Sequence, residues 1–151
     1  MMAGLRCVLL DGAAIARSLE RQDRALDPPP PYDHSAVTEP ARLAHVSADL
    51  TGVGSGALRD SALLSGLLIA AAGAAGLSAV GAPIVRSVPS GGISAVLLLD
   101  PCHVSVHSLP ERGIALVDVL ARDTAEAQKA LEVFVRRLAP ATVTSDTRMR
   151  G

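Results

Sequence analysis

The sequence predicts an α+β fold, a two-layer sandwich in which two helices cover one face of a mostly antiparallel sheet. The elements expected between residues 41 and 151 run in the order strand, helix, four strands, helix, strand. Consecutive strands joined by short turns are typical of antiparallel sheets. Both expected helices carry apolar residues at helical spacing, so each can pack on the sheet. A chain of 151 residues is long enough for one such domain.

The first part of the domain is expected to be a strand followed by a long helix. Residues 42–50 alternate enough to form a half-buried strand. The glycine-rich stretch 51–56 is expected to be a loop. Apolar residues then recur at helical spacing over 57–77, which predicts a helix that ends near Gly76.

Four strands are expected to follow, at 82–88, 93–99, 103–108 and 114–121. The turns between them contain proline and glycine, which break strands and favour turns. The strand at 93–99 is apolar almost throughout, so it is expected to be central and covered on both faces.

A helix and an edge strand complete the domain. Asp123 with Glu126 three residues later forms a capping box, and Pro140 ends the helix that begins there. Residues 141–145 predict a last edge strand. Two helices can cover only one face of the sheet, so we expect a second copy of the chain to cover the other face, as a homodimer.

Composition excludes several classes of function. The net charge of −1 provides no basic surface for nucleic acid or an acidic membrane. The apolar run 63–75 is shorter than the roughly 20 residues of a membrane span, and we expect a cytoplasmic protein.

Residues 1–40 contain four consecutive prolines and are expected to be a disordered extension of a domain at 41–151. Tyr32 and Phe134 are the only aromatic residues, so few rings can stack on a purine base.

The run Cys-His-Val-Ser-Val-His-Ser-Leu-Pro-Glu at 102–111 is the most informative motif. In a strand, His103, Ser105 and His107 share one face. The two histidines would lie about 13 Å apart, too far for one metal ion, so no metal site is expected. A Cys102–His107 pair of the thiol-hydrolase kind would need the chain to bend before the strand.

This run resembles the self-processing segment of the prokaryotic S-adenosylmethionine decarboxylase proenzymes. The likeness extends to Gly92-Ile93-Ser94, the apolar strand after it, Pro110-Glu111 and the stretch 113–118. The serine at which those proenzymes are cut is replaced here by Cys102. The resemblance implies cleavage between Pro101 and Cys102, which leaves a pyruvoyl group in place of Cys102. Such a group accepts the electrons released on decarboxylation.

The resemblance also implies roles for other residues. Ser94 and His107 would assist self-cleavage together with the nucleophile Cys102. Glu111 would hold the ribose hydroxyls of the substrate, and His103 would also contact the substrate. The small-molecule substrate would be S-adenosylmethionine or a smaller amino acid.

Two hypotheses of function therefore stand. The first is a divergent pyruvoyl-dependent decarboxylase of polyamine, or spermidine, biosynthesis. The alternative is an unprocessed, non-catalytic paralogue without a pyruvoyl group, which acts as a binding module or as the partner of an active subunit. Three departures from the family bear on this choice. Leu109 stands where the family has tryptophan, Val88 or a neighbour where it has phenylalanine, and Arg122 near the position of a catalytic cysteine.

Overall fold

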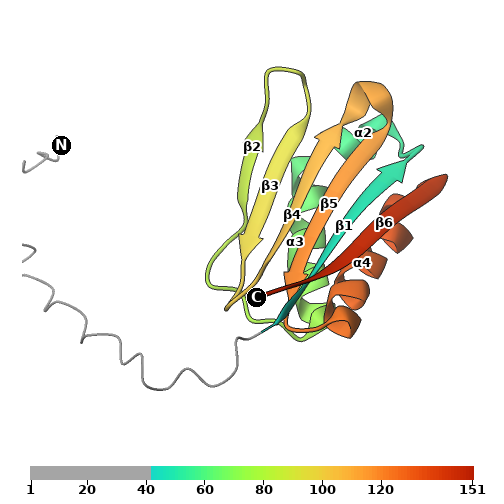
Figure 1. Cartoon of the computed structure of the whole chain (residues 1–151). Coiled ribbons are helices and arrows are strands. Elements are labelled where there is room, and N and C mark those ends of the chain that lie inside the picture. The colour runs from blue at the N-terminus through green and yellow to red at the C-terminus, as the bar shows by residue number, and fades with distance from the viewer. Residues whose placement is uncertain (1–41) are drawn as a thin grey trace, which may run out of the picture. The chain divides into compact units, whose positions relative to one another are not determined.

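The computed structural model describes residues 42–151, so the extension predicted at 1–40 lies outside the described residues. Residues 42–151 form a six-stranded sheet with its helices on one face (Figure 1). The strand order is β2-β3-β4-β5-β1-β6, and all neighbouring strands are antiparallel. The predicted α+β two-layer architecture is confirmed.

The elements closely follow the sequence pattern. The strands are β1 (Leu43–Thr51), β2 (Ile84–Ser87), β3 (Ile93–Leu98), β4 (His103–Leu109), β5 (Ile114–Ala121) and β6 (Thr142–Arg150). The helices are α2 (Ser55–Arg59), α3 (Ser61–Ala75) and α4 (Thr124–Leu138), and a 3-10 turn, η2 (Pro110–Arg112), follows β4. Within residues 42–151, no helix is long and apolar enough to span a membrane.

The expected single helix at 57–77 is wrong in one respect, because two helices occupy this region. Asp60 has an extended backbone between α2 and α3, and its carboxylate accepts a hydrogen bond from the Leu63 amide at 2.9 Å. An aspartate satisfies a free helix amide better than it fits a helix interior, so it begins a new helix. The end at Gly76 is confirmed, since Gly76 caps α3 in the left-handed conformation with φ of 70°.

Two strands differ from the prediction. β6 is longer than the expected 141–145, because it pairs with β1 without interruption as far as Arg150. β3 is second from the edge of the sheet and not at its centre. Only alternate residues of β3 are buried by the helices, namely Ile93, Ala95 and Leu97. Its other face is therefore not covered within residues 42–151, and the prediction of a strand covered on both faces is wrong for the single chain.

The core lies between the sheet and helices α3 and α4. It consists of aliphatic side chains and Phe134, which is fully buried. The opposite face of the sheet, turned toward the viewer in Figure 1, we call the open face. It carries the alternate residues of each strand, and several of these are polar, including His45, Ser94 and Asp118.

Candidate active site

Ser94 and His107 form a hydrogen-bonded pair on the open face. They lie directly opposite each other on β3 and β4. The distance between Ser94 Oγ and His107 Nδ1 is 2.9 Å. A histidine in contact with a hydroxyl can take up or deliver a proton through it. The structure thus brings together the two residues predicted to assist self-cleavage.

Contacts on the buried side of the sheet hold β3 and β4 in the register that places Ser94 opposite His107. Ser108, next to His107, points into the core, where its Oγ accepts a bond from the Ile93 amide at 2.8 Å and donates one to the Leu58 carbonyl at 2.7 Å. Gly92 lies so close to β4 that a Cβ there would be 2.2 Å from the Ser108 carbonyl oxygen. The glycine of the Gly-Ile-Ser element is therefore required by close approach of two backbones.

Cys102 lies at the other end of the sheet. It follows a tight turn in which the Leu99 amide donates to the Cys102 carbonyl at 2.9 Å. Its side chain is 4% exposed and belongs to the core beneath the helices. His107 is five residues further along β4, about 16 Å at the rise of an extended strand, and faces the opposite side. The structure therefore does not bring Cys102 together with His107 and Ser94 within one chain.

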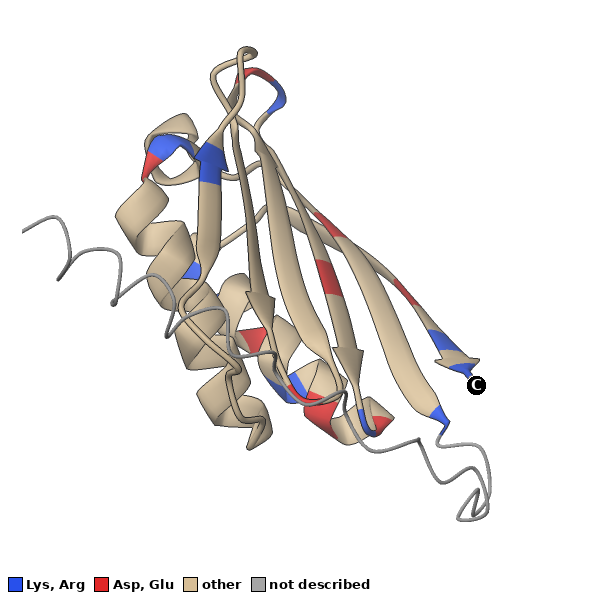
Figure 2. Ribbon diagram, turned by 90° about the vertical axis from the view of Figure 1, so that its left-hand side faces the viewer, with Lys and Arg blue, Asp and Glu red and all other residues tan. Residues whose placement is uncertain are grey.

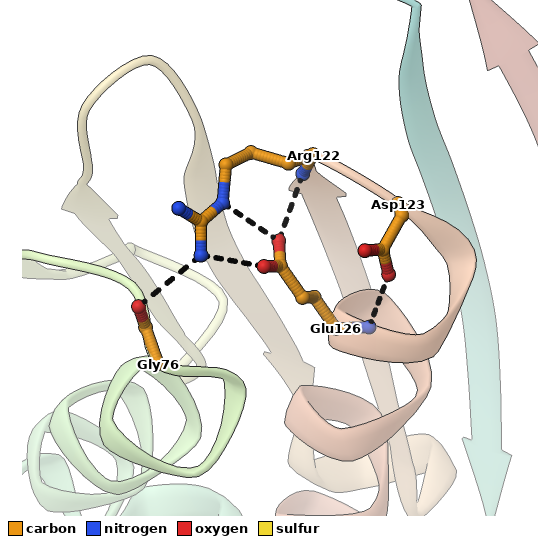
Figure 3. Close-up of polar contacts among 4 residues, drawn as sticks. All are labelled: Gly76, Arg122, Asp123 and Glu126. Carbon is orange, nitrogen blue, oxygen red and sulfur yellow. Dashed lines mark hydrogen bonds and ion pairs between the residues drawn. The ribbon is translucent and has the colours of Figure 1, made fainter.

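Arg122 and Glu126 form an ion pair (Figure 3). Both charges are close enough to Cys102 to act on its thiol. Arg122 donates from Nε to Glu126 Oε2 at 3.1 Å and from Nη2 to Oε1 at 2.5 Å. The same Nη2 donates to the Gly76 carbonyl at 3.4 Å, so the guanidinium connects the end of α3 to the start of α4. Asp123 caps α4 by accepting a bond from the Glu126 amide at 2.9 Å, which confirms the predicted cap.

The charges near Cys102 act on its thiol in opposite directions. Burial raises the pKa of the Cys102 thiol, Glu126 and Asp100 raise it further, and Arg122 lowers it. The bonds to Glu126 raise the pKa of the Arg122 guanidinium. Arg122 therefore stays charged and cannot act as a proton donor.

Glu111 lies in η2, at the same end of the sheet as Ser94 and His107. Arg59 of α2 forms an ion pair with Glu111 and also donates to the Gly91 carbonyl at 3.1 Å. Beside Glu111 is a cavity of about 160 Å³, whose lining is largely apolar and includes Leu109 and Pro110. The carboxylate predicted to bind substrate is thus held by an arginine.

His103, the other predicted substrate contact, lies at the Cys102 end of the open face. Burial lowers the pKa of His103, and the nearby His45 lowers it further, while Asp118 raises it. Asp118 also pairs with His45, with 3.4 Å between Oδ1 and Nε2. The predicted site residues therefore fall into two groups. Cys102 and His103 lie at one end of the sheet, and Ser94, His107 and Glu111 lie at the other.

Two features of the site were not predicted from the sequence, namely the role of Arg59 and the His45–Asp118 pair. Arg59 reaches Glu111 because α2 packs against η2, which no local pattern indicates. The pairing of β1 with β5 places His45 and Asp118 on neighbouring strands. Both residues lie on predicted strands. Knowledge that β1 pairs with β5, and in which register, would therefore have revealed the contact.

These features define a class of protein, an α+β sandwich with a thiol at a strand-entry turn and a Ser–His pair on the open face of its sheet. The sequence model of the family described as S-adenosylmethionine decarboxylase matches residues 44–151. The chain belongs to the S-adenosylmethionine decarboxylase family.

Individual members of this family are similar to this chain. The S-adenosylmethionine decarboxylase proenzyme of Brevibacillus brevis is 32% identical over 108 residues, which cover 71% of this chain and 80% of that protein. The proenzyme of Aquifex aeolicus is 31% identical over 108 residues, covering 71% and 79%. The crystal structure of the Aquifex aeolicus adenosylmethionine decarboxylase matches with a TM-score of 0.68 at 28% identity, covering 75% of this chain and 93% of that one. The resemblance expected from the motif is confirmed.

Proposed function

We propose that this chain is a self-processing, pyruvoyl-dependent decarboxylase of polyamine biosynthesis. The observation that carries the proposal is the bonded Ser94–His107 pair, retained on the open face of the sheet together with a nucleophilic thiol at Cys102. A purely structural role does not require a serine and a histidine to contact each other on an uncovered face. Membership of the family supplies the reaction class.

Self-processing would proceed in three steps. The Cys102 sulfur attacks the Pro101 carbonyl carbon, and the amide C–N bond breaks to give a thioester and a free amine. A base removes the Cys102 α-proton, and the Cβ–S bond breaks, so that Pro101 leaves as a thiocarboxylate. Water then hydrolyses the remaining enamine, which releases ammonia and leaves a pyruvoyl group. A thiolate is a stronger nucleophile than a hydroxyl, so cysteine can serve in this role.

The surroundings of Cys102 fit a pyruvoyl group. The residue immediately precedes β4 and follows a tight turn, so cleavage there leaves the new end attached to a paired strand. When formed, the group would bind the substrate amine and accept the electrons released with carbon dioxide. Arg122, close to Cys102 and charged, can attract the carboxylate of an incoming amino acid.

Two copies of the chain would complete the site. Packing two open faces about a two-fold axis that lies in the interface, perpendicular to the strands, reverses the strand direction of the partner. The Cys102 end of one chain then lies over the Ser94–His107 end of the other. Each dimer would hold two equivalent sites, and each site would draw residues from both chains.

The test is the mass of the purified full-length chain. We expect two polypeptides, one ending at Pro101 and one beginning with a pyruvoyl group in place of Cys102. Before hydrolysis, the first fragment should be heavier than an ordinary carboxylic acid by the difference between sulfur and oxygen, a signature that a serine precursor cannot give.

One outcome would instead favour the unprocessed paralogue. This alternative is supported by the burial of Cys102 and by Arg122 in place of a proton donor. A chain that stays at 15.4 kDa after prolonged incubation, with Cys102 still titratable as a thiol, would overturn the proposal of self-processing.

The substrate is expected to depend on Leu109. The cavity beside Leu109 and Glu111, about 160 Å³ in volume, contains no aromatic side chain that could stack on adenine. We expect Leu109→Trp to strengthen S-adenosylmethionine binding by about 1–3 kcal/mol, the contribution of stacking one base. Calorimetry on wild-type, Leu109→Trp and the size control Leu109→Met would measure this. Equal affinity of all three for S-adenosylmethionine, with tight binding by the wild type, would show that another surface holds the base.

A further inference from the structure

Strand β6 is an edge strand of the sheet that residues 42–151 form. Among residues 42–151, no strand pairs with its outer edge. All nine of its side chains are exposed on both faces, because α4 packs on β1 and β5. The helix layer therefore does not bury the side chains of β6.

The two edges of the sheet differ in how they are protected. Edge strands of natural proteins are commonly short, interrupted by proline or bulged, which prevents pairing with another chain. β2 follows this rule, because it has four residues and lies between Pro83 and Pro89. β6 has nine residues, contains no proline or glycine, and keeps an unbroken register with β1. Its threonines and valine favour a strand.

The side chains of β6 complement a second copy of the same strand. Asp146, Arg148 and Arg150 share the open face, and Asp146 bonds to Arg148 at 2.6 Å. Figure 2 shows these charges as red and blue segments on the strand that ends at C. If two β6 strands pair antiparallel with Thr147 opposite Thr147, Asp146 of each chain lies opposite Arg148 of the other. A shift that places Asp146 opposite Asp146 would bring like charges together, which is unfavourable.

We propose that β6 is an interaction surface for β6 of a second copy of this chain, paired antiparallel about a two-fold axis at Thr147. The contact joins two six-stranded sheets edge to edge into one continuous sheet. It is isologous, so each chain contributes the same residues. It is separate from the open face and does not depend on the proposed reaction. With open-face dimers, it would produce a tetramer.

Cysteine crosslinking tests the register. Directly opposite residues of antiparallel strands have Cα atoms about 4.5–5.5 Å apart, within the range of a disulfide. We expect Thr147→Cys in the full chain to form a disulfide-linked pair under mild oxidation. The matched control Ser145→Cys lies on the same strand and face, but faces Met149 of the partner, and should not crosslink. Cys7 and Cys102 are common to both variants, so they set the same background.

A charge exchange tests the partner. Asp146→Arg should place arginines opposite each other and halve the mass of the assembly in sedimentation. The double variant Asp146→Arg/Arg148→Asp should restore it. Glu132→Arg makes the same change of charge on the exposed side of α4 and should leave the mass unchanged. Failure of Thr147→Cys to crosslink above the Ser145→Cys level would overturn the proposal, whether the edge is free or another segment covers it. An unchanged mass for Asp146→Arg would do the same.

Discussion

Co-expression of Cys102→Ala and His107→Ala chains is expected to restore cleavage that neither variant shows alone. Each variant by itself lacks either the nucleophile or the histidine, so its homodimers should stay uncut. In a mixed dimer, the Cys102 end of the His107→Ala chain would lie over intact Ser94 and His107 on the Cys102→Ala chain. The physical reason is that Cys102 and His107 lie at opposite ends of the sheet, so a partner with reversed strand direction brings the two ends together.

Mass spectrometry of two differently tagged chains would measure this result. Cleavage should appear only in the His107→Ala chain, in roughly half of its copies if the chains pair at random. The control is His107→Ala with Ser94→Ala. Both substitutions lie in the Ser94–His107 pair, so every site in a mixed dimer still lacks either Ser94 or His107. No cleavage should therefore return. If the first mixture also stays uncut while each single chain folds and dimerises, the shared site is wrong.

The fold was largely predictable because its signals are local. Strand β5 was expected at 114–121 and has these bounds, since a short apolar run after a turn with proline and glycine defines it. The cap at Asp123 was predicted for the same reason, because the bond it makes spans three residues. The break at Asp60 was missed because α2 has only five residues and a single leucine, Leu58, so apolar periodicity does not mark where α2 ends.

Features that depend on the order of strands in the sheet were harder to predict from the sequence. The apolar sequence of β3 suggested a central strand, but the sheet places β4, β5 and β1 between β3 and β6. Val96 and Leu98 are apolar and face outward, and Leu98 is 51% exposed. In the sequence, an apolar residue on an open strand face cannot be distinguished from an apolar residue of the core. We propose that a second chain covers this face.

The sequence predicted which residues belong to the candidate site, but not how these residues are arranged in space. Ser94 and His107, which the resemblance singled out, are in contact, but the contact itself was not predicted. The separation of Cys102 from His107 follows from their odd spacing on a strand, which places them on opposite faces. The ion pair of Arg59 with Glu111 required the docking of α2 on η2, a contact between residues 52 positions apart. Sequence periodicity carries no information about such a contact.

Self-cleavage at Cys102 should accelerate strongly with pH. The thiolate is the attacking species, and burial and Glu126 raise the pKa of the Cys102 thiol, so most of it is protonated near neutrality. Below that pKa, the thiolate fraction and the cleavage rate should rise about tenfold for each pH unit. Freshly translated chain, incubated at several pH values and quantified by mass, would give the profile. Cys102→Ser should lack this rise, because a hydroxyl does not ionise in the same range.

Two neighbouring variants should move the profile in opposite directions. Glu126→Gln removes a negative charge that raises the thiol pKa and releases Arg122 from its ion pair, so cleavage should reach its maximum at lower pH. Arg122→Gln removes the positive charge that lowers the pKa, so the maximum should move to higher pH. Movement of both profiles in the same direction, or a rate independent of pH in the wild type, would show that thiol ionisation does not control the cleavage step.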